Sequence, residues 1–117
     1  MAAQRYHIII DLTQVPTSRL SDEDGLNNFL NTLPRLIGMK VLKPPVVING
    51  IPENPGLTGF VIIDFSHISI HTFTNHNQAL IDIFSCKSYV QEEAVKAVLE
   101  HFQADRQNAK IQQVSWG

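Results

Sequence analysis

The sequence is poor in cysteine, in positive charge and in long apolar runs. A single cysteine in 117 residues excludes an internal disulfide framework and a multi-cysteine zinc site. Nine basic residues against 11 acidic ones leave a net charge of −2, so nucleic acid is not expected as a partner. No uncharged apolar run approaches the roughly 18 residues that span a bilayer, and the first residues lack the apolar stretch of a signal peptide. We therefore expect a cytoplasmic protein with no membrane partner.

What the sequence does contain is enough apolar material for one packed core. Hydrophobic residues make up 44% of the chain and charged residues 17%, which excludes a disordered tail or a highly charged helical rod. A chain of this length buries roughly two-thirds of its unfolded surface. We therefore expect residues 1–117 to form a single domain.

The hydrophobic periodicity predicts six strands and two helices in the order β-α-β-β-β-β-α-β. One helix is expected to begin at a capping box, Ser21 with Asp24, and to end or kink at Pro34. The other is expected to begin at a box formed by Ser88 with Gln91. Apolar residues at helical spacing define its buried stripe: Ala94, Val95, Val98, Leu99 and Phe102. The strands are expected at residues 6–12, 39–51, 60–63, 67–73, 79–86 and 111–116, with a loop over 51–59 whose glycines are turn residues.

Strands that follow one another between two helices favour an α+β fold over a doubly wound parallel sheet. We predict a two-layer sandwich, a mostly antiparallel sheet of about six strands with two helices on one face. Two helices leave the other face of the sheet free for a site or a partner. Residues 67–73 alternate, so that either His67, Ser69 and His71 or Ile68 and Ile70 face that second surface.

The residues 66–86 are expected to form a β-hairpin, which returns Cys86 to the neighbourhood of Ser66. A hydroxyl, an imidazole from His71 and a thiol are the parts of a nucleophilic or acid–base site. The plainer alternative is a polar strand start, a surface histidine and a small buried cysteine. The hairpin register, and therefore which side chains share a face, is left open by the sequence.

Two other groups of polar residues carry weaker signals. His67 and His71 lie four residues apart, which on a strand is about 13 Å and too far for one metal ion, so no metal site is expected. Asp11 and Asp82 interrupt apolar strands, and each either lines a cleft or occupies an ordinary edge position.

Four segments together resemble the bacterial and archaeal S-adenosylmethionine decarboxylase proenzymes. Residues 64–73 (DFSHISIHTF) are similar to a family segment that reads roughly S-E-S-H-[IL]-[ST]-I-H-T-W. Residues 79–86 (ALIDIFSC) are similar to A-x-V-D-V-F-T-C, and residues 55–59 (PGLTG) to a G-V-S-G turn. Residues 6–11 match the first strand of the family, a histidine, apolar residues and an acid. The likeness covers nearly the whole chain in order.

The resemblance implies a self-processing, pyruvoyl-dependent decarboxylase of S-adenosylmethionine that serves spermidine synthesis. The hydroxyl of Ser66 would attack the carbonyl of Phe65, turning the peptide bond into an ester. β-Elimination would then release residues 1–65 and leave a pyruvoyl group at the start of residues 66–117. The pyruvoyl ketone would form a Schiff base with the substrate amine and accept electrons as CO₂ leaves.

The resemblance also assigns roles to individual residues. His71 would move protons during processing, because an imidazole exchanges protons near neutral pH. Cys86 would reprotonate the substrate carbon, because a thiol is mostly protonated at pH 7. Thr58 replaces a serine that assists processing, and Asp11 and Asp82 would support the site. Half-length members of the family pair into a dimer with both sites at the interface, so a homodimer is expected.

Several positions depart from the family pattern. Phe65 stands where the family has glutamate, although the acyl shift needs only the backbone carbonyl of that residue. Lys87 replaces a glycine beside the proposed acid, and Phe73 replaces a tryptophan. The changes at 65 and 87 leave two alternatives beside the main interpretation. One is a paralogue that decarboxylates another amino acid, such as arginine or ornithine. The other is an unprocessed relative with no enzymatic activity.

Overall fold

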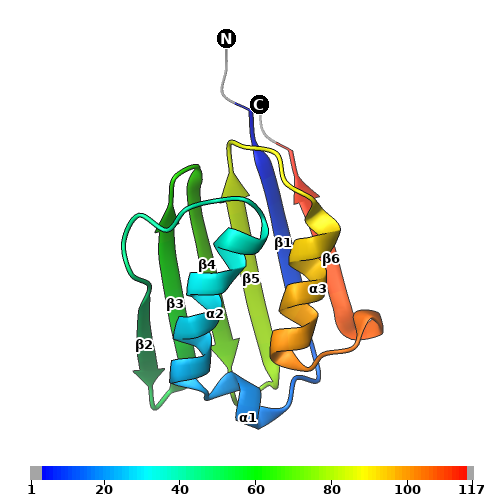
Figure 1. The fold of residues 1–117 in the computed structure, drawn as a ribbon. Helices are drawn as coiled ribbons and strands as arrows, with labels where there is room; N and C mark the ends of the chain where they lie inside the picture. Colours follow the sequence, from blue (N-terminus) through cyan, green and yellow to red (C-terminus); the bar gives the residue numbers. More distant parts are fainter. Residues whose placement is uncertain (1–3, 116–117) are drawn as a thin grey trace.

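The structure, a computed structural model that describes residues 4–115, is one antiparallel sheet with a layer of helices on one face (Figure 1). The strands lie in the order β2-β3-β4-β5-β1-β6. The two long helices α2 and α3 cover the same face of the sheet, which confirms the predicted α+β architecture. In chain order, the elements are β1 (Tyr6–Leu12), α1 (Thr17–Leu20), α2 (Glu23–Leu36), β2 (Val46–Ile51), β3 (Asn54–Ile63), β4 (Ser66–Phe73), β5 (Gln78–Ser85), α3 (Gln91–Phe102), η1 (Arg106–Asn108) and β6 (Ala109–Val114).

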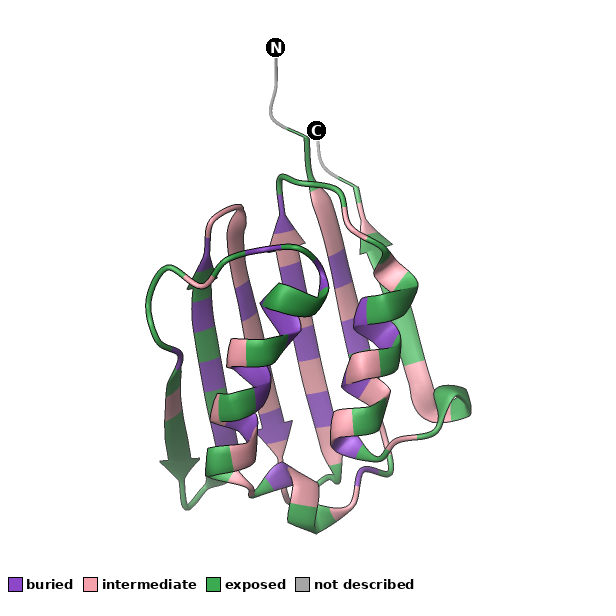
Figure 2. Ribbon diagram, viewed as in Figure 1, coloured by how far each residue is buried: buried purple, intermediate pink, exposed green. Residues whose placement is uncertain are grey.

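The core lies between the sheet and the helices. Every second residue along β4 and β5 is buried, as the alternating colours of Figure 2 show, because successive strand residues face opposite sides of a sheet. Fully buried apolar residues come from β1, β4, β5 and both long helices: Ile8, Ile10, Leu12, Ile68, Ile70, Ile81, Ile83, Leu30, Leu33, Val98 and Phe102. Leu99 of the predicted α3 stripe is only half-buried, and the other four residues are buried. None of the helices within residues 4–115 combines the length and apolar character that crossing a bilayer requires.

Both predicted capping boxes are wrong. The N-cap of α2 is Asp22, whose carboxylate accepts a hydrogen bond from the Gly25 N–H at 2.9 Å. Helix α3 begins after Val90 and has no side-chain cap among the described residues, so Ser88 does not start it. Pro34 lies inside α2, and the helix ends two residues beyond it, because proline offers no N–H to the helix and its ring crowds the preceding turn.

The segment between α2 and β4 departs most from the prediction. The expected strand 39–51 is reduced to Val46–Ile51, because Pro44 and Pro45 have no N–H to donate, and Val41 makes only an isolated bridge to Ile63. The expected loop over 51–59 is instead largely strand, since β3 begins at Asn54. The last strand is Ala109–Val114, and the predicted end at Trp116 lies outside the described residues.

The glycines of β3 are close-approach residues and not the turn residues that we expected. A Cβ atom on Gly56 would lie 1.9 Å from the backbone oxygen of Thr72, and Gly56 has a φ of +145°. A Cβ atom on Gly59 would lie 2.6 Å from Leu30 Cδ1 of α2. These contacts explain why a glycine-rich segment forms a strand against β4 and α2.

Thr72 joins β3, β4 and the first short helix through one buried hydroxyl. Its Oγ1 accepts a hydrogen bond from the Leu57 N–H and donates one to the Leu20 carbonyl, each at 2.8 Å. We predict that Thr72→Val lowers the free energy of unfolding by about 2–4 kcal/mol, because both backbone groups lose their partner in a buried site. Urea denaturation measures the change. Thr32→Val, on the exposed side of α2, is the matched control and should change stability by less than about 0.5 kcal/mol. Equal midpoints for Thr72→Val and wild type would contradict this role of Thr72.

Candidate functional site

The peptide bond between Phe65 and Ser66 lies at a tight turn. Ile63 pairs with Ser66, so that Asp64 and Phe65 alone connect β3 to β4. Ser66 has a φ of 139°, a conformation that costs a non-glycine residue on the order of 1–3 kcal/mol. The structure therefore places backbone strain at the residue that the sequence singled out as a nucleophile.

Cys86 lies beside this turn, where the predicted hairpin puts it. Ser66 pairs with Ser85 across β4 and β5, and the Cys86 N–H donates a hydrogen bond of 2.9 Å to the Phe65 carbonyl. The Cys86 residue is exposed, in contrast to the small buried cysteine of the plainer interpretation. A nucleophile attacking the Phe65 carbonyl would thus find its oxygen already held by a backbone donor.

His71 is not part of this cluster within one chain. It lies five residues from Ser66 along the same strand, a separation of about 16 Å. Its Nδ1 lies 3.2 Å from Thr58 Oγ1 on the neighbouring strand β3, with which it is paired. The predicted group of hydroxyl, imidazole and thiol therefore divides in two, Ser66 with Cys86 at one end of β4 and His71 with Thr58 toward the other.

Asp82 is engaged by a residue that the sequence analysis did not select. His7 Nε2 lies 2.7 Å from Asp82 Oδ1, and the two residues come from the adjacent strands β1 and β5. Both lie on the face of the sheet opposite the helices, since the alternate residues Ile8 and Ile83 are buried. The sequence does show that a histidine and an aspartate each interrupt an apolar strand. That the two are in contact follows only from the order of the strands in the sheet.

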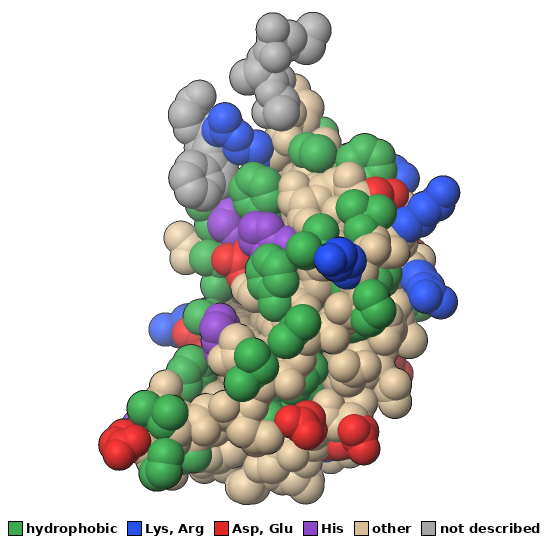
Figure 3. All heavy atoms as spheres, turned by 90° about the vertical axis from the view of Figure 1, so that its left-hand side faces the viewer, with side chains coloured by type: hydrophobic (Ala, Val, Ile, Leu, Met, Phe, Trp, Pro, Cys, Tyr) green, Lys and Arg blue, Asp and Glu red, His purple; other side chains and the backbone are tan. Residues whose placement is uncertain are grey.

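Aromatic and imidazole rings form a row across the same face, over the strands β3, β4, β5 and β1. The ring centroids of Phe60 and His67 lie 5.3 Å apart, those of His67 and Phe84 5.6 Å apart, and those of Phe84 and His7 5.1 Å apart. Figure 3, which views the β2 edge, shows the visible histidine side chains toward the left of the view, with hydrophobic side chains beside them and across the surface. We call this face of the sheet the open face.

The open face is also apolar at its β2 edge. Phe60 and Ile62 are 40% and 44% exposed, and Val46 and Ile48 are 55% and 60% exposed. Val46 pairs with Phe60 and Ile48 with Thr58, so that these side chains extend the same surface. The structure decides which alternating set of β4 residues faces this surface. His67, Ser69 and His71 face it, whereas Ile68 and Ile70 are buried.

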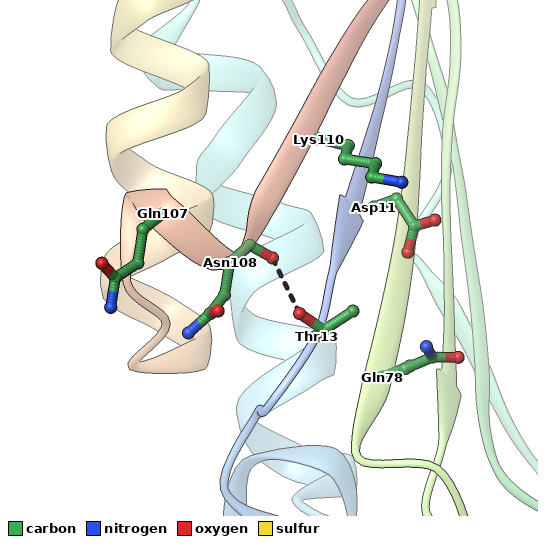
Figure 4. A pocket seen from close by; sticks show the side chains of 6 residues that line it. All are labelled: Asp11, Thr13, Gln78, Gln107, Asn108 and Lys110. Atoms are coloured by element: carbon green, nitrogen blue, oxygen red, sulfur yellow. Dashed lines mark hydrogen bonds between the residues drawn. The ribbon is translucent and has the colours of Figure 1, made fainter.

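Asp11 lines a separate polar cavity of about 200 Å³ between β1, β5 and β6 (Figure 4). Lys110 is its partner in the β1–β6 register, and Gln78 and Asn108 also line the cavity. Asp11 pairs with Leu80, which in turn pairs with His71, so this cavity is level with His71 and distant from Ser66. Of the two aspartates that the sequence selected, Asp11 therefore lines a cavity and Asp82 is paired with His7.

Burial, with a smaller contribution from the charge of Asp82, raises the pKa of Tyr89 above its usual value of 10. Tyr89 lies three residues beyond Cys86, in the loop that leads to α3. Its hydroxyl is buried and has no hydrogen-bond partner among the described residues. The phenol therefore stays neutral over the physiological pH range.

Comparison with known proteins identifies the family. Residues 6–113 match the family model described as S-adenosylmethionine decarboxylase. The chain belongs to the S-adenosylmethionine decarboxylase family. An S-adenosylmethionine decarboxylase proenzyme from Parasynechococcus marenigrum (strain WH8102) is 33% identical over 93 residues, which cover 80% of this chain and 70% of that protein. An S-adenosylmethionine decarboxylase proenzyme 2 from Bacillus anthracis is 36% identical over 85 residues, which cover 73% of this chain and 67% of that protein.

The fold agrees with a solved member of the family. The crystal structure of the adenosylmethionine decarboxylase from Aquifex aeolicus superposes with a TM-score of 0.82 at 22% identity, covering 100% of this chain and 93% of that one. The comparisons thus confirm the resemblance drawn from the four sequence segments, and they support the decarboxylase interpretation that came with it.

Proposed function

We propose that this member of the S-adenosylmethionine decarboxylase family cuts itself between Phe65 and Ser66 and then decarboxylates S-adenosylmethionine for spermidine synthesis. The observation that carries the proposal is the hydrogen bond from the Cys86 N–H to the Phe65 carbonyl, 2.9 Å long, at a turn where Ser66 has a φ of 139°. A polarised carbonyl next to a serine hydroxyl in strained backbone is what an acyl shift needs.

Self-processing would proceed by an acyl shift, an elimination and a hydrolysis. Ser66 Oγ adds to the Phe65 carbonyl carbon, the C–N bond breaks, and the peptide becomes an ester with a free amine on residue 66. Loss of the Cα proton of residue 66 breaks the Cβ–Oγ bond, and the carboxylate of residues 1–65 leaves. The resulting dehydroalanine tautomerises to an imine, which water hydrolyses to ammonia and a ketone. The negative charge of the first addition falls on the oxygen that the Cys86 N–H already holds.

The residues present fit a pyruvoyl group at the start of residues 66–117. The serine from which it would form opens β4, and the exposed Cys86 is its neighbour across the hairpin. Such a ketone supplies the electron sink that loss of CO₂ requires. The Cys86 thiol would hold the proton that the substrate carbon takes up afterwards.

The open face supports S-adenosylmethionine over arginine or ornithine as the substrate. S-adenosylmethionine carries a flat purine and a sulfonium cation. The row Phe60–His67–Phe84–His7 offers rings for both, since aromatic faces stack on flat bases and attract cations. Arginine and ornithine have no purine to use such a row.

The separation of His71 from Ser66 supports a homodimer. A proton carrier must lie within hydrogen-bond reach of the group that it serves, and about 16 Å of strand is too far. A second copy related by a two-fold axis would present its own His71 and Thr58 across the interface. The exposed apolar residues of the open face, among them Phe60 and Val46, are surface that such a contact would cover.

Denaturing mass spectrometry of the purified wild-type protein tests the proposed function. We expect two chains, residues 1–65 and residues 66–117, the second blocked at its N-terminus by pyruvoyl. A protein that stays intact after long incubation near neutral pH would overturn the proposal in favour of a non-enzymatic relative. A protein that is cut but releases no CO₂ from S-adenosylmethionine would favour the decarboxylase of another amino acid.

A further inference from the structure

Two side chains on either side of the candidate site contact each other. The Lys87 ammonium nitrogen lies 5.2 Å from the centroid of the Phe65 ring, within cation–π range. The same Nζ donates a hydrogen bond of 3.0 Å to the Gly38 carbonyl, just beyond the end of α2. Lys87 therefore links the turn that holds Phe65 to the loop that follows α2.

The backbone of Lys87 is fixed by a buried hydroxyl. Ser85 is 0% exposed; its Oγ accepts a hydrogen bond of 2.9 Å from the Lys87 N–H and donates one of 2.8 Å to the Lys87 carbonyl. These two bonds close a tight turn around Cys86. Because these bonds tie the backbone of Lys87 to the last residue of β5, its ammonium can hold the Phe65 ring in a defined place.

The turn is held from its other side by the same loop. The Asp64 N–H donates to the Lys40 carbonyl, and the Lys40 N–H donates to Asp64 Oδ1, each at 3.0 Å. The loop thus contacts Asp64 through Lys40 and Lys87 through Gly38. Phe65 lies between these two attachments, and its carbonyl is bonded to the Cys86 N–H.

We propose that Lys87 is a positioning residue for self-processing, which holds Phe65 so that its carbonyl stays on the Cys86 N–H while Ser66 remains in its strained conformation. The inference rests on the proposed self-cleavage at Phe65–Ser66. A strained backbone persists only where its surroundings fix it. Without the ammonium, the Phe65 ring keeps only its partial packing against the core. The turn then relaxes, and the carbonyl leaves the donor that favours the attack of Ser66.

The test is the rate at which freshly translated precursor is cut, followed by intact mass. Lys87→Met, which keeps the length of the side chain and removes the charge, should slow cleavage by about tenfold. Lys87→Arg should restore it to within about threefold, because a guanidinium can also lie on an aromatic ring and donate to a carbonyl. Lys43→Met, at an exposed lysine of the loop after α2, is the matched control and should be cut at the wild-type rate.

A double-mutant cycle with Phe65→Leu tests whether Lys87 acts through the ring. If it does, Phe65→Leu slows cleavage to a similar extent, and the double variant is no slower than either single one. Additive effects would overturn the proposal. So would a Lys87→Met variant that is slow, is not rescued by arginine and also melts at a lower temperature, since that pattern belongs to a merely structural lysine.

Hydroxylamine, which cuts esters, locates the blocked step. We expect the slow Lys87→Met precursor to resist hydroxylamine, because it waits as an amide before the acyl shift. A hydroxylamine-sensitive precursor would place the block after the shift and overturn the assignment. Wild type that is never cut would overturn both this inference and the proposed function, whereas Lys87→Met cut as fast as wild type would overturn this inference alone.

Discussion

We expect Ser66→Ala and His71→Ala each to remain a single chain when expressed alone, and co-expression of the two to restore cleavage of the His71→Ala chain. Ser66→Ala has no hydroxyl for the acyl shift. His71→Ala keeps the hydroxyl but lacks the imidazole that we propose as the proton carrier, and such proton transfer typically contributes about 10²–10⁴-fold. In the mixed dimer that we propose, the intact His71 of one subunit would face the intact Ser66 of the other.

The expectation follows from the position of His71 on β4. Its partner within the chain is Thr58, 3.2 Å away. Across the neighbouring strands, His71 is level with Leu80 and Asp11. Five residues of strand separate it from Ser66. An imidazole acting within its own chain would have to cross this distance, whereas a two-fold axis through the open face can bring the partner's pair to the turn at Phe65.

Intact mass identifies which subunit is cut, because the Ser66→Ala chain should keep its full mass while residues 66–117 appear with the mass that the His71→Ala change gives them. Co-expression of Ser66→Ala with the double variant Ser66→Ala/His71→Ala is the control, and neither chain should be cut. If the His71→Ala chain stays whole in the mixed dimer, the composite site is wrong. A single species near 13.1 kDa at all concentrations in sedimentation equilibrium would contradict the dimer itself.

The sequence pattern was sufficient to predict the central hairpin and to place Cys86 close to Ser66. Both follow from local turns and period-2 alternation, which act over about twenty residues of chain. His71 does not join them, because the rise of about 3.3 Å per residue puts it about 16 Å from Ser66 along β4.

The features that the sequence analysis missed depend on contacts between distant segments. Gly56 and Gly59 have the spacing of turn residues in the sequence, but in the structure they lie against Thr72 and Leu30. His7 and Asp82 are 75 residues apart and meet only because β1 lies between β5 and β6. Such pairings are set by the order of strands in the sheet, which hydrophobic periodicity alone does not determine.

Two departures from the family pattern also have a spatial relation that the sequence does not display. Phe65 and Lys87 were considered one by one, as a lost carboxylate and an added charge. In the structure, the ammonium of Lys87 lies over the ring of Phe65. The two changes therefore form one contact beside the proposed cleavage site, which is compatible with a turn that can process itself.

Cys86→Ala separates processing from turnover. We expect the variant to cut itself, because the donor to the Phe65 carbonyl is the backbone N–H of residue 86, which alanine keeps. Decarboxylation of S-adenosylmethionine should fall by about 10²–10⁴-fold, because the thiol that we propose as the proton donor to the substrate carbon is gone. Intact mass measures the first property and release of labelled CO₂ the second.

The exposed neighbour Ser88 offers the control, since Ser88→Ala should cut itself and decarboxylate like wild type. Cys86→Ser keeps a hydroxyl in place of the thiol. Because a hydroxyl is a much weaker acid than a thiol, this variant should stay close to Cys86→Ala in turnover while it is cut normally. Decarboxylation by Cys86→Ala at the wild-type rate would remove the acid role from Cys86 and leave its N–H as the only contribution of that residue. Failure of Cys86→Ala to cut itself would mean instead that the thiol takes part in processing. That result would contradict the assignment of processing to the backbone N–H, which rests on the 2.9 Å hydrogen bond.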